Sequence, residues 1–456
     1  MKKYILFFAS VLFMLNAASA QKKTDTTKNV LDKAKIQYKL SDAKSKYYTS
    51  NYRGALNIYR EIIVAAPNTP KAHYGVAECQ FALKNFELAN THMQLAIEGD
   101  VEVDKEVDYL NASIQHRLGN LEIALAGFEK FKATIVSSPK KMEEYDIDLM
   151  IAHCKYAIAN ATNISDVKIK NMGSAINTSF PEFAPCISLD GKSMVITSRR
   201  GDTKGGGVDV NFDHQYYSDV YISTWNDEEQ DWNPTEPITG KINTEFHDGA
   251  TSFMPSGELL LYRNIFGATR SGDIYFSKQS TSSGKWSTPR EMLKKEGMHK
   301  KLNSTYFESS ACITEDEKSL YFVSDRPGGQ GQADIFVMKK KGREWTEPEN
   351  LGAVINSASD EKCVAIHPSG NAIFFSSNGF AEGFGSYDLY YSVKDAKGNW
   401  SKPVNFGAPI NTVKEEKTIA ISADGNTAYV SAYYDIDNRG DADIYEIDIS
   451  SLNIIK

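Results

Sequence analysis

The sequence predicts a chain of two parts, an α-helical repeat domain followed by a larger all-β domain of repeated units. From about Asn29 to Ala161, apolar residues recur with the period of an α-helix and proline is rare. From about Ile164 to the end, they alternate with the period of a β-strand. Within each part a motif returns at a nearly constant interval, which indicates a repeat architecture.

The first twenty residues are expected to belong to neither part. Two lysines precede an apolar run from Tyr4 to Leu15, and Ala18-Ser19-Ala20 follows. This is the pattern of a secretory signal peptide, so we expect cleavage after Ala20, export to the periplasm and a short linker over residues 21–28. No later segment has the roughly 18 consecutive apolar residues that a transmembrane helix needs. Any association with the outer membrane is therefore expected to pass through a partner.

A pattern of small and large residues recurs three times in the helical part, residues 29–162. Each copy has an alanine with a large residue three positions before it and another four positions after it. Such an alanine lets two antiparallel helices approach closely while the large residues fill the groove on either side. The alanines are Ala55, Ala89 and Ala124, spaced by 34 and 35 residues, and Ala43, Ala77 and Ala112 stand in the preceding helices.

This pattern resembles the tetratricopeptide repeat, whose period is 34 residues. The turn within each helix pair is marked by Ser50-Asn51, Lys84-Asn85 and Gly119-Asn120. A further helix from Glu143 to Ala161 is expected to cap the stack. An unrelated helical bundle is the alternative interpretation.

The β part, residues 163–456, contains five copies of one unit. Each copy has a turn, an apolar strand that usually ends in Ser, and an Asp followed by Val, Ile or Leu and then Tyr or Phe. Four short strands per unit are typical of a β-propeller blade. We expect five blades, with six as the alternative if the longest interval hides an extra element. The repeated aspartates are Asp219, Asp273, Asp334, Asp388 and Asp443, at intervals of 54, 61, 54 and 55 residues.

The outer strand of a blade is marked by a Trp and a following Pro. The fifth copy lacks this strand, so we expect the strand around Val167–Ile169 to complete that blade and close the ring. An Ile-Asn or Leu-Asn element precedes every copy, as at Ile355-Asn356. The four tryptophans are Trp232, Trp286, Trp345 and Trp400.

Two of the turns, Ser188-Leu189-Asp190-Gly191 and Ser422-Ala423-Asp424-Gly425, resemble the WD40-like propeller repeats of the TolB type. An exported chain that joins tetratricopeptide repeats to such a propeller is similar to the PorE-like OmpA-family proteins of the type IX secretion and gliding machinery of Bacteroidota. That resemblance implies a periplasmic scaffold that works with an outer-membrane partner. Those relatives carry a peptidoglycan-binding domain that has no counterpart before Lys456, so peptidoglycan anchoring is not implied.

Composition and motifs argue against several classes of chemistry. A formal net charge of −8 and a pI near 5.6 are not those of a general nucleic-acid binder. The histidines show no zinc-binding spacing, and no nucleophile elbow is present. We expect the repeated aspartates and tryptophans to be structural, and we expect no catalytic residues and no cofactor.

One acidic segment fits the spacing of a calcium loop, with Asp435, Asp437, Asp441 and Glu446 as candidate ligands. Arg439 stands where a ligand belongs, and no helices flank the segment. Five cysteines form no C-x-x-C pair and are expected to be free and buried, with a disulfide or a zinc site as the alternatives.

Recognition is expected on the variable loops between the second and third strands of the blades. These loops carry aromatic residues that we expect to be exposed and to bind a partner, namely Tyr216, Tyr217, Phe380 and Phe384. The sequence thus favours a non-catalytic periplasmic adaptor that binds protein partners. The alternatives are a glycan- or peptide-processing enzyme built on the propeller, and a module that binds muropeptides.

Overall fold

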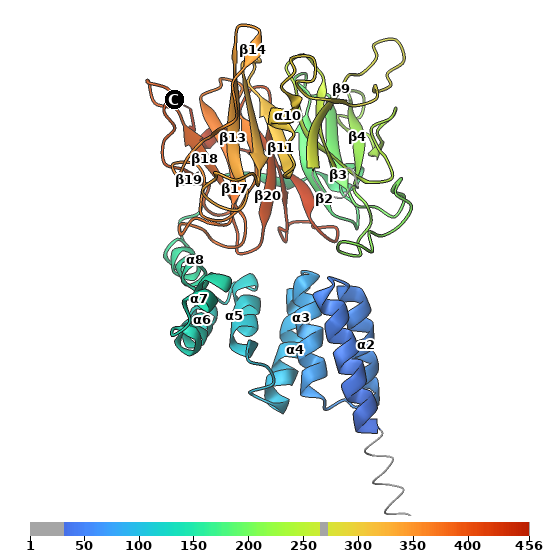
Figure 1. The fold of residues 1–456 in the computed structure, drawn as a ribbon, viewed down its shortest axis with the longest axis vertical. Helices are drawn as coiled ribbons and strands as arrows, with labels where there is room; N and C mark the ends of the chain where they lie inside the picture. Colours follow the sequence, from blue (N-terminus) through green and yellow to red (C-terminus); the bar gives the residue numbers. More distant parts are fainter. Residues whose placement is uncertain (1–31, 265–271, 456) are drawn as a thin grey trace, which may run out of the picture. The chain divides into compact units, whose positions relative to one another are not determined.

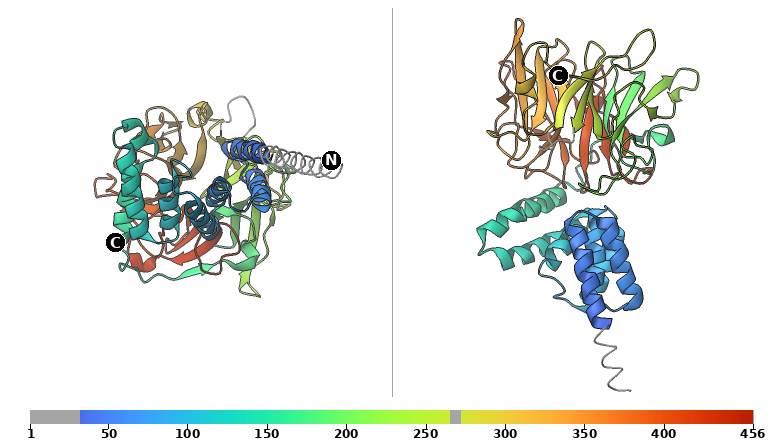
Figure 2. Two further views of the ribbon diagram at one scale, coloured as in Figure 1. Left: turned by 90° about the horizontal axis from the view of Figure 1, so that it is seen from below. Right: turned by 45° about the vertical axis from the view of Figure 1, so that its right-hand side comes forward.

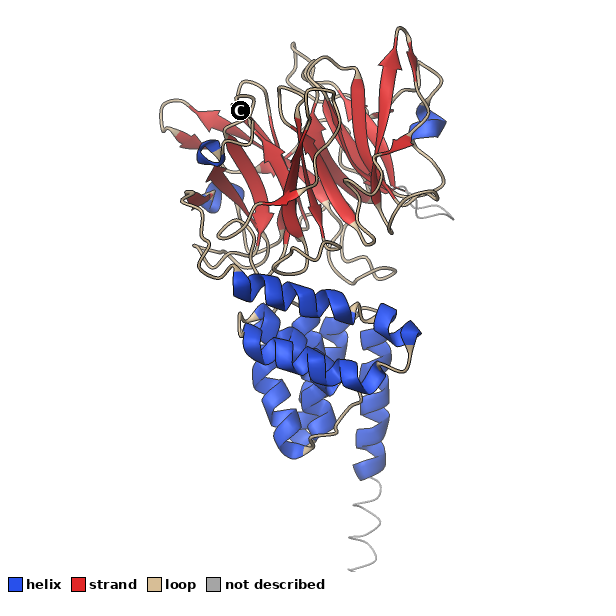
Figure 3. Ribbon diagram, turned by 90° about the vertical axis from the view of Figure 1, so that its left-hand side faces the viewer, coloured by secondary structure: helices blue, strands red, loops and turns tan. Residues whose placement is uncertain are grey.

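The computed structural model describes residues 32–264 and 272–455, which form two compact units (Figure 1). The first unit contains the described residues up to Ile114 together with Val210–His214. The second contains Gln115–Asp209 and the chain from Gln215 onward. Helices dominate the N-terminal part of the chain and strands the C-terminal part, as Figure 3 shows. The expected signal peptide and linker lie outside the described residues.

The first unit is a series of antiparallel helix pairs. Residues 32–48 are helical, and α2 (Tyr52–Ala65), α3 (Pro70–Ala82), α4 (Phe86–Gly99) and the greater part of α5 (Val107–Arg117) follow, which Figure 2 shows from two further sides. The alanines Ala43, Ala55, Ala77 and Ala89 are fully buried. Close packing of antiparallel helices at these alanines confirms the predicted tetratricopeptide-like repeat.

The turn within each pair has one repeated geometry. Ser50, Lys84 and Gly119 have positive φ angles of 58°, 63° and 77°. The backbone N–H of the following asparagine then donates to the carbonyl five residues earlier, with each N–O distance 2.9 Å. This is the Schellman arrangement that ends a helix through one left-handed residue. The dipeptides identified in the sequence therefore mark helix ends with a defined backbone conformation.

The second unit begins with the last helices of the helical part: α6 (Leu121–Ile135), α7 (Pro139–Glu144) and α8 (Ile147–Ala159). A single helix was expected from Glu143 to Ala161, but the chain breaks at Asp146, whose φ is +45°. A left-handed residue cannot continue a right-handed helix, so α8 starts afresh after it. On α8, Ile151, Cys154 and Ala157 are buried, as the helical period predicts.

The strands of the described residues form five antiparallel sheets, the blades of the propeller. The first blade contains β2 (Glu182–Ile187), β3 (Ser193–Ser198), β4 (Asp219–Asn226), β5 (Asp231–Trp232) and β6 (Glu236–Pro237). The second contains β7 (His247–Phe253), β8 (Leu259–Asn264), β9 (Gly272–Ser277) and β10 (Arg290–Glu291). The third contains β11 (Glu308–Ile313), β12 (Ser319–Ser324), β13 (Asp334–Lys341), β14 (Glu344–Trp345) and β15 (Glu349–Asn350).

The fourth blade contains β16 (Glu361–Ile366), β17 (Ala372–Ser377), β18 (Asp388–Val393) and β19 (Val404–Asn405). The fifth contains β20 (Glu416–Ile421), β21 (Thr427–Ala432) and β22 (Asp443–Asp448), and β1 (Ile169–Asn171). Short helices α9 (Gly173–Ile176), α10 (His299–Leu302) and a 3₁₀ turn (Ser450–Leu452) lie in the connections.

The ring closes as the sequence predicted. The first strands of neighbouring blades contact one another all the way round, and β20 of the fifth blade meets β2 of the first. The strand β1 pairs with β22, with Ile169 opposite Ile447. The N-terminal strand of the β part therefore completes the fifth blade, and the propeller has five blades rather than six.

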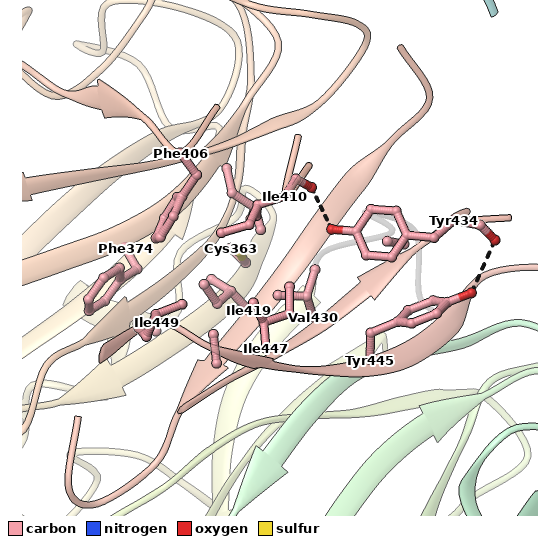
Figure 4. Close-up of a cluster of buried hydrophobic side chains, with 14 of the residues drawn as sticks. Cys363, Phe374, Phe406, Ile410, Ile419, Val430, Tyr434, Tyr445, Ile447 and Ile449 are labelled. Atoms are coloured by element: carbon pink, nitrogen blue, oxygen red, sulfur yellow. Dashed lines mark hydrogen bonds between the residues drawn. The ribbon is translucent and has the colours of Figure 1, made fainter. Parts of the chain in front are cut away.

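Apolar side chains fill the spaces between blades. In the cluster drawn in Figure 4, Phe374 of the fourth blade lies with Ile419, Val430 and Tyr445 of the fifth, all under 7% exposed. The Tyr445 hydroxyl donates to the Tyr434 carbonyl at 3.1 Å, so the polar end of this buried tyrosine is satisfied. All five cysteines are buried and free, in agreement with their interpretation as small apolar residues.

Candidate partner-binding surfaces

An asparagine holds each connection between blades. The Asn243 side chain accepts from the Val220 N–H at 2.8 Å and donates to the Val220 carbonyl at 3.0 Å, so one amide replaces a pair of strand hydrogen bonds. Val220 directly follows a repeated aspartate. The same clasp joins Asn177 to Ile444, Asn303 to Ile274, Asn356 to Ile335 and Asn411 to Leu389. This is the role of the Ile-Asn element found in the sequence.

A buried carboxylate stands near the start of every first strand, a feature that the sequence reasoning missed. In the fifth blade, Glu416 accepts from both the N–H and the hydroxyl of Thr412. The signal was present, because a Ser or Thr follows each clasp asparagine and an acidic residue lies four positions later. The five acids are Glu182, Asp248, Glu308, Glu361 and Glu416, each at most 1% exposed.

Three of these acids are paired with arginine. Arg200 lies 3.1 Å from Glu182, Arg263 lies 2.8 Å from Asp248, and Arg326 lies 2.8 Å from Glu308. In the fourth blade Gly379 stands two residues after the second strand, where Arg326 stands in the third. Burial raises the pKa of Glu361 to about 7 despite hydrogen bonds from Ser357 and Ser377. Burial likewise raises the pKa of Glu416 well above the ordinary range.

The repeated aspartates hold the loops that precede them. Asp334 accepts from the N–H of Gly331 at 3.1 Å, and Asp443 accepts from the N–H of Arg439 at 2.9 Å. Lys204 and Phe384 donate their N–H groups to Asp219 and Asp388 in the same manner. Most of the loop before Asp273 lies outside the described residues. Of the repeated tryptophans, Trp232, Trp286 and Trp345 are at most 8% exposed, and Trp400 is half-buried.

The loop aromatics differ in accessibility. Tyr216 and Tyr217 are half-buried, with Tyr216 edge-on to Phe180. Phe380 is half-buried against Tyr390, with ring centroids 4.9 Å apart.

Phe384 was expected to be exposed, and this expectation is wrong. Its side chain is 5% exposed, and its ring lies edge-on to Tyr156 of α8 at 5.2 Å. The helix covers this loop of the fourth blade, so Phe384 is part of the core of the second unit.

The candidate calcium ligands do not converge. Asp435 pairs with Lys414 at 2.6 Å and its side chain is 90% exposed, whereas Glu446 lies within β22 opposite Lys170. The Asp441 side chain accepts from the N–H of Ala442, and Asp437 has a positive φ of 48°. Among residues 32–264 and 272–455, no three His, Cys, Asp or Glu side chains are arranged to share a metal ion.

The first strands of the blades enclose a cavity of about 270 Å³. Its walls are mainly apolar, including Ile187, Ile313 and Ile421, and the turns at its mouth contribute Glu315 and His367. Glu315 is the one carboxylate in this lining. The cavity can therefore accept an apolar group, but it does not assemble a pair of acidic residues.

The helical unit carries a cluster of tyrosines around one ion pair, which we call the tyrosine cluster: Lys44, Tyr47, Tyr48, Tyr74 and Glu78. The Lys44 ammonium lies 2.7 Å from a Glu78 carboxylate oxygen. It also lies 5.2 Å from the ring centroids of Tyr47 and Tyr48 and 5.8 Å from that of Tyr74. These distances fall within the range of cation–π attraction.

Two tyrosines of the first helix are unusually accessible. Tyr38 is 75% exposed and Tyr48 is 74% exposed, whereas Tyr59 and Tyr74 of the same unit are at most 4% exposed. Tyrosine has an apolar ring and a polar end, and it is enriched in protein–protein interfaces. The helix that includes residues 32–48 therefore presents a surface suited to a protein partner.

No family model matches the chain, and no curated protein matches it. Among solved structures, the Yersinia enterocolitica type III secretion chaperone SycD, in complex with a peptide of the translocator YopD, is 18% identical. That match covers 27% of this chain and 93% of SycD, with a TM-score of 0.24. The TPR2B domain of yeast Sti1 is 19% identical over 27% of this chain and 97% of its own, with a TM-score of 0.24.

A protein of unknown function from Dyadobacter fermentans is 12% identical over 59% of this chain and 76% of its own, with a TM-score of 0.37. All of these TM-scores are below 0.5. In the described part of the chain, no helix combines the length and apolar character needed to cross a bilayer.

Proposed function

We propose that this protein is a non-catalytic scaffold that binds protein partners through its helical repeats. The observation that carries the proposal is the pair of exposed tyrosines, Tyr38 and Tyr48, on the first described helix. Large aromatic side chains at a surface supply contact area with few rotatable bonds, and tyrosine is frequent among the residues that dominate binding energy. The propeller supplies a second surface, on which Asp219, Asp334, Asp388 and Asp443 hold the loops that precede them.

We further propose that the scaffold acts in the periplasm, next to an outer-membrane component of a secretion or gliding machinery. The support is the N-terminal pattern of a signal peptide and the resemblance of the repeats to exported proteins of Bacteroidota.

The proposed lack of catalysis is supported by the five buried carboxylates at the first strands of the blades. Each accepts a hydrogen bond from the Ser or Thr four residues before it, so these acids are engaged in holding the blades. A Glu315→Gln variant is accordingly expected to retain partner capture, because the one carboxylate of the cavity lining is not needed for it.

Photo-crosslinking in the native envelope tests the proposal. A photoreactive phenylalanine analogue at Tyr48 is expected to capture a protein partner that co-purifies with the full chain. The matched control places the same analogue at Lys397, an exposed residue of a propeller turn, and is expected to give no such product. Absence of a crosslinked protein at both Tyr48 and Tyr38 would count against the scaffold function.

A further inference from the structure

In the tyrosine cluster, aromatic rings and a carboxylate together surround the ammonium group of Lys44. Three rings lie within 6 Å of the Lys44 ammonium, and the carboxylate of Glu78 completes its surroundings. The side chain of Glu78 is 8% exposed, whereas that of Lys44 is 31% exposed and that of Tyr48 lies open to solvent. The acidic end of the cluster is therefore buried, whereas Lys44 and Tyr48 lie on its more accessible side.

The acidic character extends beyond Glu78. Between Glu98 and Asp108, six of eleven residues are acidic and one is basic. The pKa of Glu78 is raised to about 7, chiefly by burial and in part by the nearby carboxylates of Asp104 and Glu106, although Lys44 lowers it. The carboxylates of Glu78 and Asp104 both act on Lys44, so the surroundings of the cluster contribute negative charge beyond the one carboxylate that pairs with this lysine.

We propose that the tyrosine cluster is the recognition site for a basic segment of the protein partner, and that Lys44 occupies it as an internal stand-in. A lysine or arginine of the partner takes the place of Lys44 between the rings of Tyr47, Tyr48 and Tyr74 and pairs with Glu78. Lys44, on its flexible stem, then turns toward solvent. This inference rests on the proposed function, because it specifies the chemistry of the partner that the helical repeats bind.

Displacement of Lys44 by the partner and a purely stabilising Lys44–Glu78 ion pair predict different effects of removing Lys44. If Lys44 competes with the partner's cation, only molecules in which Lys44 is displaced can bind the partner, and this lowers the apparent affinity. Removing Lys44 makes every molecule competent, so the affinity should rise. If the pair merely stabilises the helices, Lys44→Ala has no reason to improve binding. The decisive readout is therefore a gain of affinity and not a loss.

The probe is a fluorescein-labelled peptide of alternating lysine and glycine, titrated into the full chain and followed by fluorescence anisotropy. Lys44→Ala is expected to strengthen binding roughly five- to tenfold, and Tyr48→Ala to weaken it about fivefold. The matched control is Lys39→Ala, on the same helix as Lys44, which removes an exposed ion pair with Glu61 of α2 and is expected to leave the affinity unchanged. A glutamate–glycine peptide of equal length is expected to bind at least tenfold more weakly.

Unchanged or weaker binding by Lys44→Ala, or equal binding of the two peptides, would overturn the inference. The scaffold function is tested by crosslinking, and the basic partner is tested by the peptide titration, so the two proposals can fail separately. If Tyr48 still crosslinks to a protein in the envelope while the lysine–glycine peptide does not bind, the scaffold function stands and the basic partner is wrong. Circular dichroism of each variant shows whether the helical unit remains folded.

Discussion

The Nε2 atom of His153 donates a hydrogen bond to the carbonyl oxygen of Phe380 at 2.9 Å. His153 lies on α8, and Phe380 lies in a loop of the fourth blade. Arg117 makes a related contact, because its guanidinium donates to the Val413 carbonyl at 2.9 Å. The last helices of the helical part therefore form one compact unit with the propeller. Two ionisable side chains, Arg117 and His153, make hydrogen bonds across this contact.

The protonation of His153 is expected to couple stability to pH. Burial lowers the pKa of His153 to about 4, whereas an unfolded histidine titrates near about 6.5. The neutral form is favoured in the folded state, so its contribution is complete above pH 6.5 and is lost as the pH falls from about 6.5 to 4. The loss is expected to reach about 3 kcal/mol.

Urea unfolding of the second unit at pH 7.0 and pH 4.5 measures this effect. His153→Gln, which has no titrating group, is expected to show a smaller difference between the two pH values. His214→Gln, at a half-buried loop position grouped with the first unit, is the control and should leave the pH dependence of the second unit as it is in the parent chain. An equal pH dependence in the parent and His153→Gln would show that other groups are responsible.

The asparagine clasp is expected to be costly to remove. Asn356→Ala leaves the buried N–H of Ile335 without its partner and removes one of two hydrogen bonds to the Ile335 carbonyl, which also accepts from the Leu351 N–H. We expect a loss of about 1 to 3 kcal/mol in the free energy of unfolding. Asn371→Ala, at an exposed turn of the fourth blade, should cost less than about 0.5 kcal/mol. Similar values for the two variants would contradict a clasp role.

Breaking a buried ion pair of the third blade should harm stability more than removing both charges. Arg326→Gln leaves Glu308 buried at 0% exposure without its cation, and we expect a loss of about 3 to 5 kcal/mol. Adding Glu308→Gln should restore part of that loss, because the uncompensated charge is gone. A double variant that is less stable than Arg326→Gln would show that the hydrogen bonds of Glu308 outweigh its charge. Chemical denaturation of the three chains gives the comparison.

Two glycines with similar backbone angles should respond differently to alanine. Gly240 has a φ of +97°, and an added Cβ would lie 2.1 Å from the backbone oxygen of Trp286 in the next blade. Gly257 has a φ of +85° and open space around it. Gly257→Ala is expected to cost about 1 to 2 kcal/mol through its left-handed conformation alone. Gly240→Ala should exceed that by at least about 2 kcal/mol because the strands must separate.

Thermal unfolding of both glycine variants checks this difference. Equal midpoints would mean that the backbone at Gly240 moves freely, and the parallel bridge between Gly240 and Trp286 would then contribute little.

Much of the fold could be predicted because the repeats are local patterns. Alanines spaced by 34 and 35 residues identified the helix pairs, and five recurring aspartates identified the blades. The strand that closes the ring could be predicted because the fifth copy of the unit lacked its outer strand, while the segment around Val167–Ile169 formed an additional strand before the first copy. The buried carboxylates also leave a repeated signal, four residues after a Ser or Thr, and it was overlooked because charged residues are usually exposed.

The sequence by itself determined which faces of the helices and strands are apolar, because their periods are set by backbone geometry over a few residues. It did not determine which surface covers which. Phe384 is buried because α8, more than two hundred residues earlier, lies against it. Lys44 stands among three rings because α3 presents Tyr74 and Glu78 to the helix that includes residues 32–48. Both outcomes depend on contacts between distant segments, and these arise only when the whole chain is packed.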